Sequence, residues 1–168
     1  AQIKNLSAAY TELAKDILPK LRRSQLALTV IKAGKTDAQI LEMAKANPDT
    51  LNVEELMYAA TIAATAEDAA AFTEANANQN PDNWRAVNNL AALQFTKGEF
   101  DNTKATLANA ANNGGAEAAE TNFNNALLAL VDNNTEDAAA FLGKAASIEQ
   151  LNEAQGVLSI QKGEYAKA

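Results

Sequence analysis

Apolar residues recur at helical spacing along much of the 168-residue chain. Two clear runs are Val87, Leu90, Ala91 and Phe95, and Phe123, Leu127, Leu130 and Val131. Intervals of three and four residues place such side chains on one face of a helix. A single helix pair of this size cannot bury its apolar face, so we expect successive pairs to stack.

Capping patterns predict where several helices begin. Asn52 is followed three residues later by Glu55, the spacing of a capping box. Asn80-Pro81 predicts an N-cap followed by the first helical residue. Two further pairs with capping spacing are Thr36 with Gln39 and Thr65 with Asp68.

Glycines and asparagines predict where helices end. Gly98 and Gly163 stand between helical segments, where we expect a left-handed turn. Asn112-Asn113 and Asn133-Asn134 predict helix-ending turns. Gly114-Gly115 predicts a joint, because the Lys and the Ser or Thr of a phosphate-binding loop do not follow it.

Residues 1–48 form a leader with a different pattern. Apolar positions within residues 3–21 predict an amphipathic helix, which Pro19 kinks or ends. For the run Leu26–Ile31 we expect extended or loop structure, because a lone strand has no partner here; an edge strand is the alternative. A further helix is predicted over Ala38–Ala46.

Small and apolar landmarks recur through residues 49–168. Matching positions in four successive segments are 34, 35 and 30 residues apart. These positions are Met57, Ala91, Ala126 and Gly156. Such a period is typical of a solenoid of helix–turn–helix units. We expect about four repeats in this region, the last of them cut short.

Three segments and several small residues carry a first resemblance. The segments are Asn80-Pro81-Asp82, Lys97-Gly98-Glu99-Phe100 and Lys162-Gly163-Glu164-Tyr165. They resemble the tetratricopeptide repeat (TPR), in which small residues let paired helices approach closely. The small positions hold Ala91, Ala126, Gly156, Ala69, Ala138, Ala168, Ala110 and Ala145, with larger residues at Met57, Thr103 and Asn76. The resemblance implies an all-α, right-handed superhelix with a helical N-terminal leader.

Five further segments carry a second resemblance. They are residues 3–7, 12–24, 34–37, 51–56 and 58–61. Together they resemble a family of Bacteroidetes cell-envelope proteins in which an outer-membrane-protein-A-like (OmpA-like) region precedes a TPR array. This resemblance implies a periplasmic or outer-membrane-associated location, and a chain excised from a longer protein. We then expect Val157 and Ile160 to be exposed and the C-terminal end to self-associate or fray.

Composition narrows the classes of function. The chain has no Cys and no His, so it lacks thiol nucleophiles and the commonest metal ligand and general base. Its 14 Lys and Arg against 21 Asp and Glu give a net charge of −7, which disfavours nucleic acids. No apolar run reaches about 18 residues, so we expect no transmembrane segment. We expect no enzyme, no cofactor and no metal site.

Paired acidic residues are the obvious candidates for acid–base chemistry. The pairs are Glu54-Glu55, Glu67-Asp68 and Glu136-Asp137. Each lies in the first turn of a predicted helix, where negative charge meets the helix dipole. Adjacent residues also point in different directions on a helix. We therefore expect these pairs to face the dipole and solvent rather than to catalyse a reaction.

Other polar and aromatic features have a structural and a functional interpretation. The basic cluster Lys20, Arg22 and Arg23 is a candidate for an anionic surface, or is simply solvated. Asn88-Asn89 and Asn124-Asn125 lie within predicted helices, where Asn is unfavourable, and are candidates for a polar task. We expect the sole Trp to pack at the start of a repeat, with a groove contact as the alternative.

In TPR arrays the first helix of each repeat lines a concave groove. The resemblance places there Glu54, Tyr58, Arg85, Asn88, Phe95, Phe123 and Leu127, with Glu153 and Val157 at the far end. The carboxylate clamp of some family members is not matched. We expect an apolar or helical segment of a protein or peptide. The alternative is that Phe123 and Leu127 are covered within a tight superhelix.

These expectations describe a non-catalytic protein–protein interaction scaffold of the bacterial cell envelope. A structural spacer within a larger peptidoglycan-associated outer-membrane protein is the alternative. A small-ligand or peptide enzyme is a third interpretation, which the lack of His and Cys disfavours.

Overall fold

The computed structural model describes Thr11, Lys15 and residues 34–165. The chain divides into two compact units, residues 1–34 and 35–168. The predicted amphipathic helix, apart from Thr11 and Lys15, lies outside the described residues, as do the run Leu26–Ile31, the basic cluster and Ala168.

The described part of the second unit is all-α, as predicted. Between residues 34 and 165 it has eight α-helices and two short helical turns, and no strand. The α-helices are α3 (Asp37–Ala46), α4 (Val53–Thr61), α5 (Ala66–Gln79), α6 (Trp84–Thr96), α7 (Phe100–Ala110), α8 (Ala119–Val131), α9 (Thr135–Lys144) and α10 (Leu151–Gln161). The turns are the 3₁₀ turn η3 (Pro48–Thr50) and the π-helical turn η4 (Ala111–Gly115).

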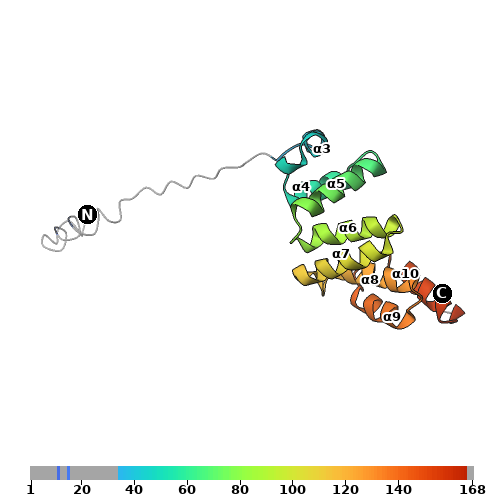
Figure 1. The fold of residues 1–168 in the computed structure, drawn as a ribbon. Coiled ribbons are helices and arrows are strands. Elements are labelled where there is room, and N and C mark those ends of the chain that lie inside the picture. Colours follow the sequence, from blue (N-terminus) through green and yellow to red (C-terminus); the bar gives the residue numbers. More distant parts are fainter. Residues whose placement is uncertain (1–10, 12–14, 16–33, 166–168) are drawn as a thin grey trace. The chain divides into compact units, whose positions relative to one another are not determined.

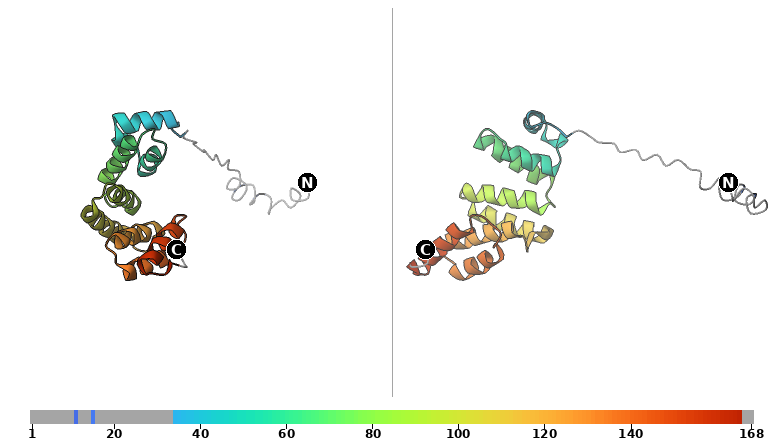
Figure 2. Two further views of the ribbon diagram at one scale, coloured as in Figure 1. Left: turned by 90° about the vertical axis from the view of Figure 1, so that its right-hand side faces the viewer. Right: turned by 180° about the vertical axis from the view of Figure 1, so that it is seen from behind.

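Consecutive helices pack as pairs, and the pairs stack in chain order. Helix α4 packs on α5, α6 on α7 and α8 on α9, while α5–α6, α7–α8 and α9–α10 contacts join neighbouring pairs. Within this unit the helices follow a curved path from α3 to α10 (Figures 1 and 2). Helix α8 also contacts both α6 and α10, so the first helices of successive pairs lie side by side.

Several of the predicted small positions are buried in the array. Ala91 and Ala126, at two of the predicted landmarks, are fully buried. Gly156 stands at a third landmark, where we expected a small residue to let two helices approach closely. That close approach is not found, because a Cβ added at Gly156 would meet nothing within 4 Å. Asn76 is buried at a position where we noted a larger residue, and its amide donates to the Val53 carbonyl oxygen at 3.0 Å. A hydrogen bond thus replaces close apolar contact at that position.

Buried residues form one cluster toward each end of the unit. The first joins α3, α4 and α5 and contains Ile40, Ala44, Leu51, Leu56, Ala59 and Phe72. The second joins α8, α9 and α10 and contains Ala126, Ala129, Leu130, Ala138, Leu142, Ala154 and Leu158. Burial of each large aliphatic side chain contributes roughly 1.5–3 kcal/mol, so stacking of the pairs stabilises helices that are individually short.

Three of the four predicted side-chain caps, Thr36, Asn52 and Thr65, begin α3, α4 and α5. The Asn52 oxygen accepts from the Glu55 amide at 2.9 Å, and the Glu55 carboxylate accepts from the Asn52 amide at 3.1 Å. Thr36 forms the same reciprocal box with Gln39 at the start of α3. Thr65 accepts from the backbone amide of Asp68 at 3.1 Å.

The predicted start at Asn80-Pro81 is wrong. Helix α6 begins at Trp84, and its N-cap is Asn83, whose side-chain oxygen accepts from the amides of Arg85 and Ala86. Asn80 instead ends α5, and its carbonyl accepts from the Asn83 amide to close a turn around Pro81. Asn83 is the N-cap rather than Asn80 because its side-chain oxygen accepts from two backbone amides of the first helical turn.

Left-handed residues end three helices in the same way. Gly98 and Gly163 have φ of +76° and +74°, and Asn133 has +55°. The residue that follows each of them donates its backbone N–H to the carbonyl oxygen five residues before it. In the first case the Glu99 amide donates to the Gln94 carbonyl oxygen at 2.9 Å. This six-to-one bond is the Schellman ending, which favours Gly or Asn at the left-handed position. Predicted turns at Gly98, Gly163 and Asn133-Asn134 are confirmed.

Candidate functional site

The surface predicted as a groove divides into a polar part and an apolar part. Glu54, Tyr58, Arg85 and Asn88 belong to the polar part on α4 and α6. Phe95, Phe123 and Leu127 belong to the apolar part on α6 and α8. Side chains of the polar part form hydrogen bonds or ion pairs, whereas those of the apolar part line a common pocket.

In the polar part the charged groups pair with one another. The Arg85 guanidinium donates to the Glu54 carboxylate at 2.6 Å, which joins α6 to α4, and both side chains stay largely exposed. The Tyr58 hydroxyl donates to the Asp37 carboxylate at 3.1 Å. That hydrogen bond and the negative charge of Asp37 raise the pKa of the Tyr58 phenol above its ordinary value.

Asparagines join the first helices of two successive pairs. Asn88 is only 4% exposed, and its side-chain oxygen accepts from the Asn124 amide at 3.0 Å across the α6–α8 contact. Asn125 instead bonds within its own helix, to the Thr121 carbonyl at 2.9 Å. Asn88 therefore acts first as a link between repeats, although it also borders a small polar pocket of about 170 Å³ with Trp84, Arg85 and Glu120.

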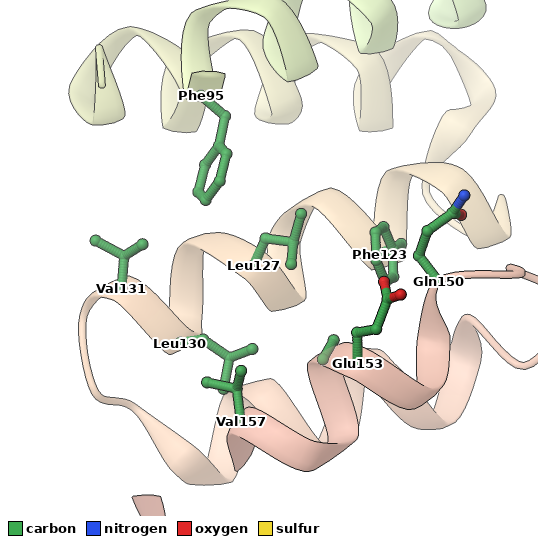
Figure 3. Close-up of a pocket in the computed structure, with 9 residues that line it drawn as sticks. Phe95, Phe123, Leu127, Leu130, Val131, Gln150, Glu153 and Val157 are labelled. Atoms are coloured by element: carbon green, nitrogen blue, oxygen red, sulfur yellow. The ribbon is translucent and has the colours of Figure 1, made fainter. Parts of the chain in front are cut away.

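The apolar part contains a pocket of about 480 Å³ where α6, α8 and α10 meet (Figure 3). Its lining consists of Phe95, Phe123, Leu127, Leu130, Val131, Gln150, Glu153, Ala154 and Val157. Pockets of roughly 300–1,000 Å³ with mostly apolar walls are typical of ligand sites. Three residues predicted for the groove, Phe95, Phe123 and Leu127, thus share one pocket.

The pocket is polar at one end only. Phe95 points from α6 toward α8, and Leu127 lies on the facing side of the pocket (Figure 3). Gln150 and Glu153 lie beside Phe123 at one end, and Val131 lies at the other. Val131 and Val157 are 47% and 46% exposed, whereas the floor residues Leu130 and Ala154 are buried. The walls therefore present apolar surface to solvent beside one carboxylate.

Trp84 lies at the joint between two pairs, as its structural interpretation predicts, and it also borders the small polar pocket beside Arg85 and Asn88, where the alternative interpretation places it. It is half-buried, and a Cβ added at Gly115 would lie 3.2 Å from the Trp84 Cβ. Gly114, with φ of +100°, provides the turn next to it. The two glycines let the η4 turn pass close to the first residue of α6.

The three acidic pairs lie at the helix starts where the sequence predicts them. All three pairs lie in first helical turns, of α4, α5 and α9, as predicted. Within residues 34–165, Thr11 and Lys15, no group of three or more Asp and Glu is placed to hold a metal ion. No helix in the same part of the chain is long and apolar enough to cross a membrane.

Sequence reasoning missed part of the pocket and the role of one asparagine. Gln150 and Ala154 line the pocket although they were absent from the predicted groove. The helical spacing of Glu153, Ala154 and Val157 on α10, with Gln150 at its N-cap, could have grouped them on one face. Nothing in the sequence predicts the bond from Asn124 to Asn88, because it depends on how two repeats align.

The chain was compared with models of protein families, with curated proteins and with solved structures. None of these comparisons found a match.

Proposed function

We propose that this chain is a non-catalytic protein–protein interaction scaffold that binds its partner through the concave face of a TPR-like array. The observation that carries the proposal is the solvent-open apolar pocket formed by α6, α8 and α10. A concave site of this volume with mostly apolar walls is typical of a surface that binds another molecule. The helix pairs and the intervals of 34, 35 and 30 residues between landmarks support a TPR-like superhelix.

A protein segment fits this site better than a small substrate does. The lining provides apolar side chains and one carboxylate, with no nucleophile or second titratable group beside them. Such a site supplies binding energy by burial and orientation by a single charge. The second resemblance suggests a bacterial cell-envelope location, periplasmic or outer-membrane-associated.

A structural spacer is the second candidate function, and the polar part favours it. There Arg85 pairs with Glu54, and Asn88 pairs with Asn124, so these groups hold the array together. A spacer needs such internal links and no open pocket. The apolar pocket is the feature that the spacer does not explain.

The experiment is an affinity capture from a bacterial cell-envelope extract with two matched variants. Val157→Asn changes an exposed wall of the pocket, and Ile160→Asn changes a residue on the same helix that is 54% exposed and outside the pocket lining. We expect a protein retained by the original chain and by Ile160→Asn, and lost with Val157→Asn. Circular dichroism checks that both variants remain helical.

Loss of the captured protein with both variants, or with neither, would contradict binding at the pocket. If none of the three chains retains a protein, the spacer becomes the better proposal.

A further inference from the structure

The described array carries a large excess of negative charge. Residues 34–165 contain seven Lys and Arg against nineteen Asp and Glu, a net charge of −12. Five of the seven basic side chains already form ion pairs. Those pairs join Lys35 to Glu55, Lys45 to Asp68, Arg85 to Glu54, Lys97 to Glu74 and Lys144 to Glu117. The field of the described array is therefore negative, and the full chain has a net charge of −7.

One residue of the pocket lining carries negative charge. Glu153 is the sole charged side chain among the nine that line it, and it is exposed. Gln150, next to it, supplies an uncharged amide at the same end of the pocket (Figure 3). A cation placed there gains the Glu153 carboxylate as a hydrogen-bond acceptor and a favourable field, whereas an anion meets an unfavourable field.

The polar part provides few free polar groups, so a partner without apolar side chains would gain little binding energy there. Its carboxylate Glu54 is paired with Arg85 at 2.6 Å, and its buried amide Asn88 is bonded at 3.0 Å. Breaking either contact to bind a partner costs about as much as the new contact returns. Affinity therefore has to come from apolar burial at α6, α8 and α10.

We infer that the pocket binds a basic amphipathic segment of another protein, with apolar side chains seated against Phe95, Leu127 and Val157 and a Lys or Arg at Glu153. The inference rests on the proposed function and adds the chemistry of the partner. Apolar side chains at helical intervals fill grooves of this kind, and basic side chains between them match the acidic surface.

A designed peptide pair tests this chemistry on the full chain. One fluorescent peptide of about four helical turns carries Leu on one face and Lys on the other; the second replaces every Lys with Glu. Fluorescence anisotropy should show binding of the Lys peptide and about tenfold or more weaker binding of the Glu peptide. Raising the salt from low to about 0.3 M should weaken Lys-peptide binding, because exposed charges are screened.

Variants in α10 and just before it test whether the peptide binds at the apolar pocket. Glu153→Gln should weaken Lys-peptide binding about three- to fivefold, the range of an exposed ion pair, whereas Glu149→Gln, at an exposed acid outside the lining, should not. Val157→Asn should weaken it about fivefold or more, because an apolar contact is replaced by a polar group. Ile160→Asn is the matched control.

Equal binding of the two peptides would overturn the inference, as would equal effects of Glu153→Gln and Glu149→Gln. Sedimentation velocity adds another refuting result. A concentration-dependent dimer that Val157→Asn abolishes would show that a second copy covers this face. If neither peptide binds but the extract protein is still captured through Val157, the charge inference fails and the proposed function stands. If both assays fail, both proposals fail.

Discussion

The joint at Gly115 allows a quantitative test of how closely two repeats approach. An ideal Cβ at this position would lie 2.9 Å from the Ala110 carbonyl oxygen, 3.1 Å from the Thr121 hydroxyl oxygen and 3.2 Å from the Trp84 Cβ. The first of these atoms is backbone and cannot rotate away. Gly115→Ala therefore requires the η4 turn to shift relative to the end of α7, and the 3.2 Å contact with the Trp84 Cβ requires it to shift relative to the start of α6 as well.

The magnitude follows from two opposing contributions. Forcing an extra methyl group into a well-packed site costs roughly 1–3 kcal/mol. Replacing Gly by Ala at a negative φ returns about 0.4–1 kcal/mol, because the unfolded chain has less freedom to lose. We expect a net loss of about 1–2 kcal/mol, and a fall in Tm of about 2–8 °C for a chain of this size.

Gly143→Ala is the matched control, because it lies in α9 with nothing within 4 Å of its Cβ position. It should leave the structure unchanged and stabilise the helix by up to about 1 kcal/mol. Thermal and urea unfolding followed by circular dichroism give the two stabilities. The sole Trp, Trp84, lies against Gly115, so its fluorescence should change with Gly115→Ala and not with Gly143→Ala.

The reasoning is refuted if Gly115→Ala is as stable as the original chain and leaves the Trp84 fluorescence unchanged. That result would mean that the η4 turn and α6 are further apart than the structure places them.

Two further predictions concern contacts of the polar part. Asn124→Ala should lower the free energy of unfolding by about 1–3 kcal/mol, because the buried Asn88 oxygen loses its partner, while Asn125→Ala should change it by less than about 0.5 kcal/mol in urea unfolding; similar losses for both would contradict the link. Asp37→Asn should lower the pKa of the Tyr58 phenol toward its ordinary value, seen by tyrosinate absorbance. Because the folded-state pKa is raised, this contact stabilises the fold below about pH 10 and is lost as the pH rises through the raised value. A titration curve identical to that of the original chain would refute the contact.

Several helix boundaries were predictable because caps act over a few residues. The box at Asn52 and Glu55 and the left-handed turn at Gly98 depend on side chains and backbone freedom within one turn. The start of α6 was missed because Asn80 and Asn83 are both good caps within four residues. Local spacing alone did not rank them.

The pocket could be predicted only in part. The TPR resemblance placed Phe95, Phe123 and Leu127 in one groove, and in the structure the three line one pocket. The periodicity did not show that Asn88 would be buried or that Gln150 would border the same space, because both depend on contacts between repeats.

By itself the sequence determined that the described array is helical, where several of its helices begin or end, and which residues form the apolar faces of α6 and α8. Those properties depend on neighbours within about four residues. Only the tertiary structure decided that the Asn88 side-chain oxygen accepts a hydrogen bond from the Asn124 amide. It also decided that the Glu153 carboxylate lies at one end of an apolar pocket. Such outcomes depend on side chains about 30 or more residues apart, and the stacking of one helix pair on the next sets their distances.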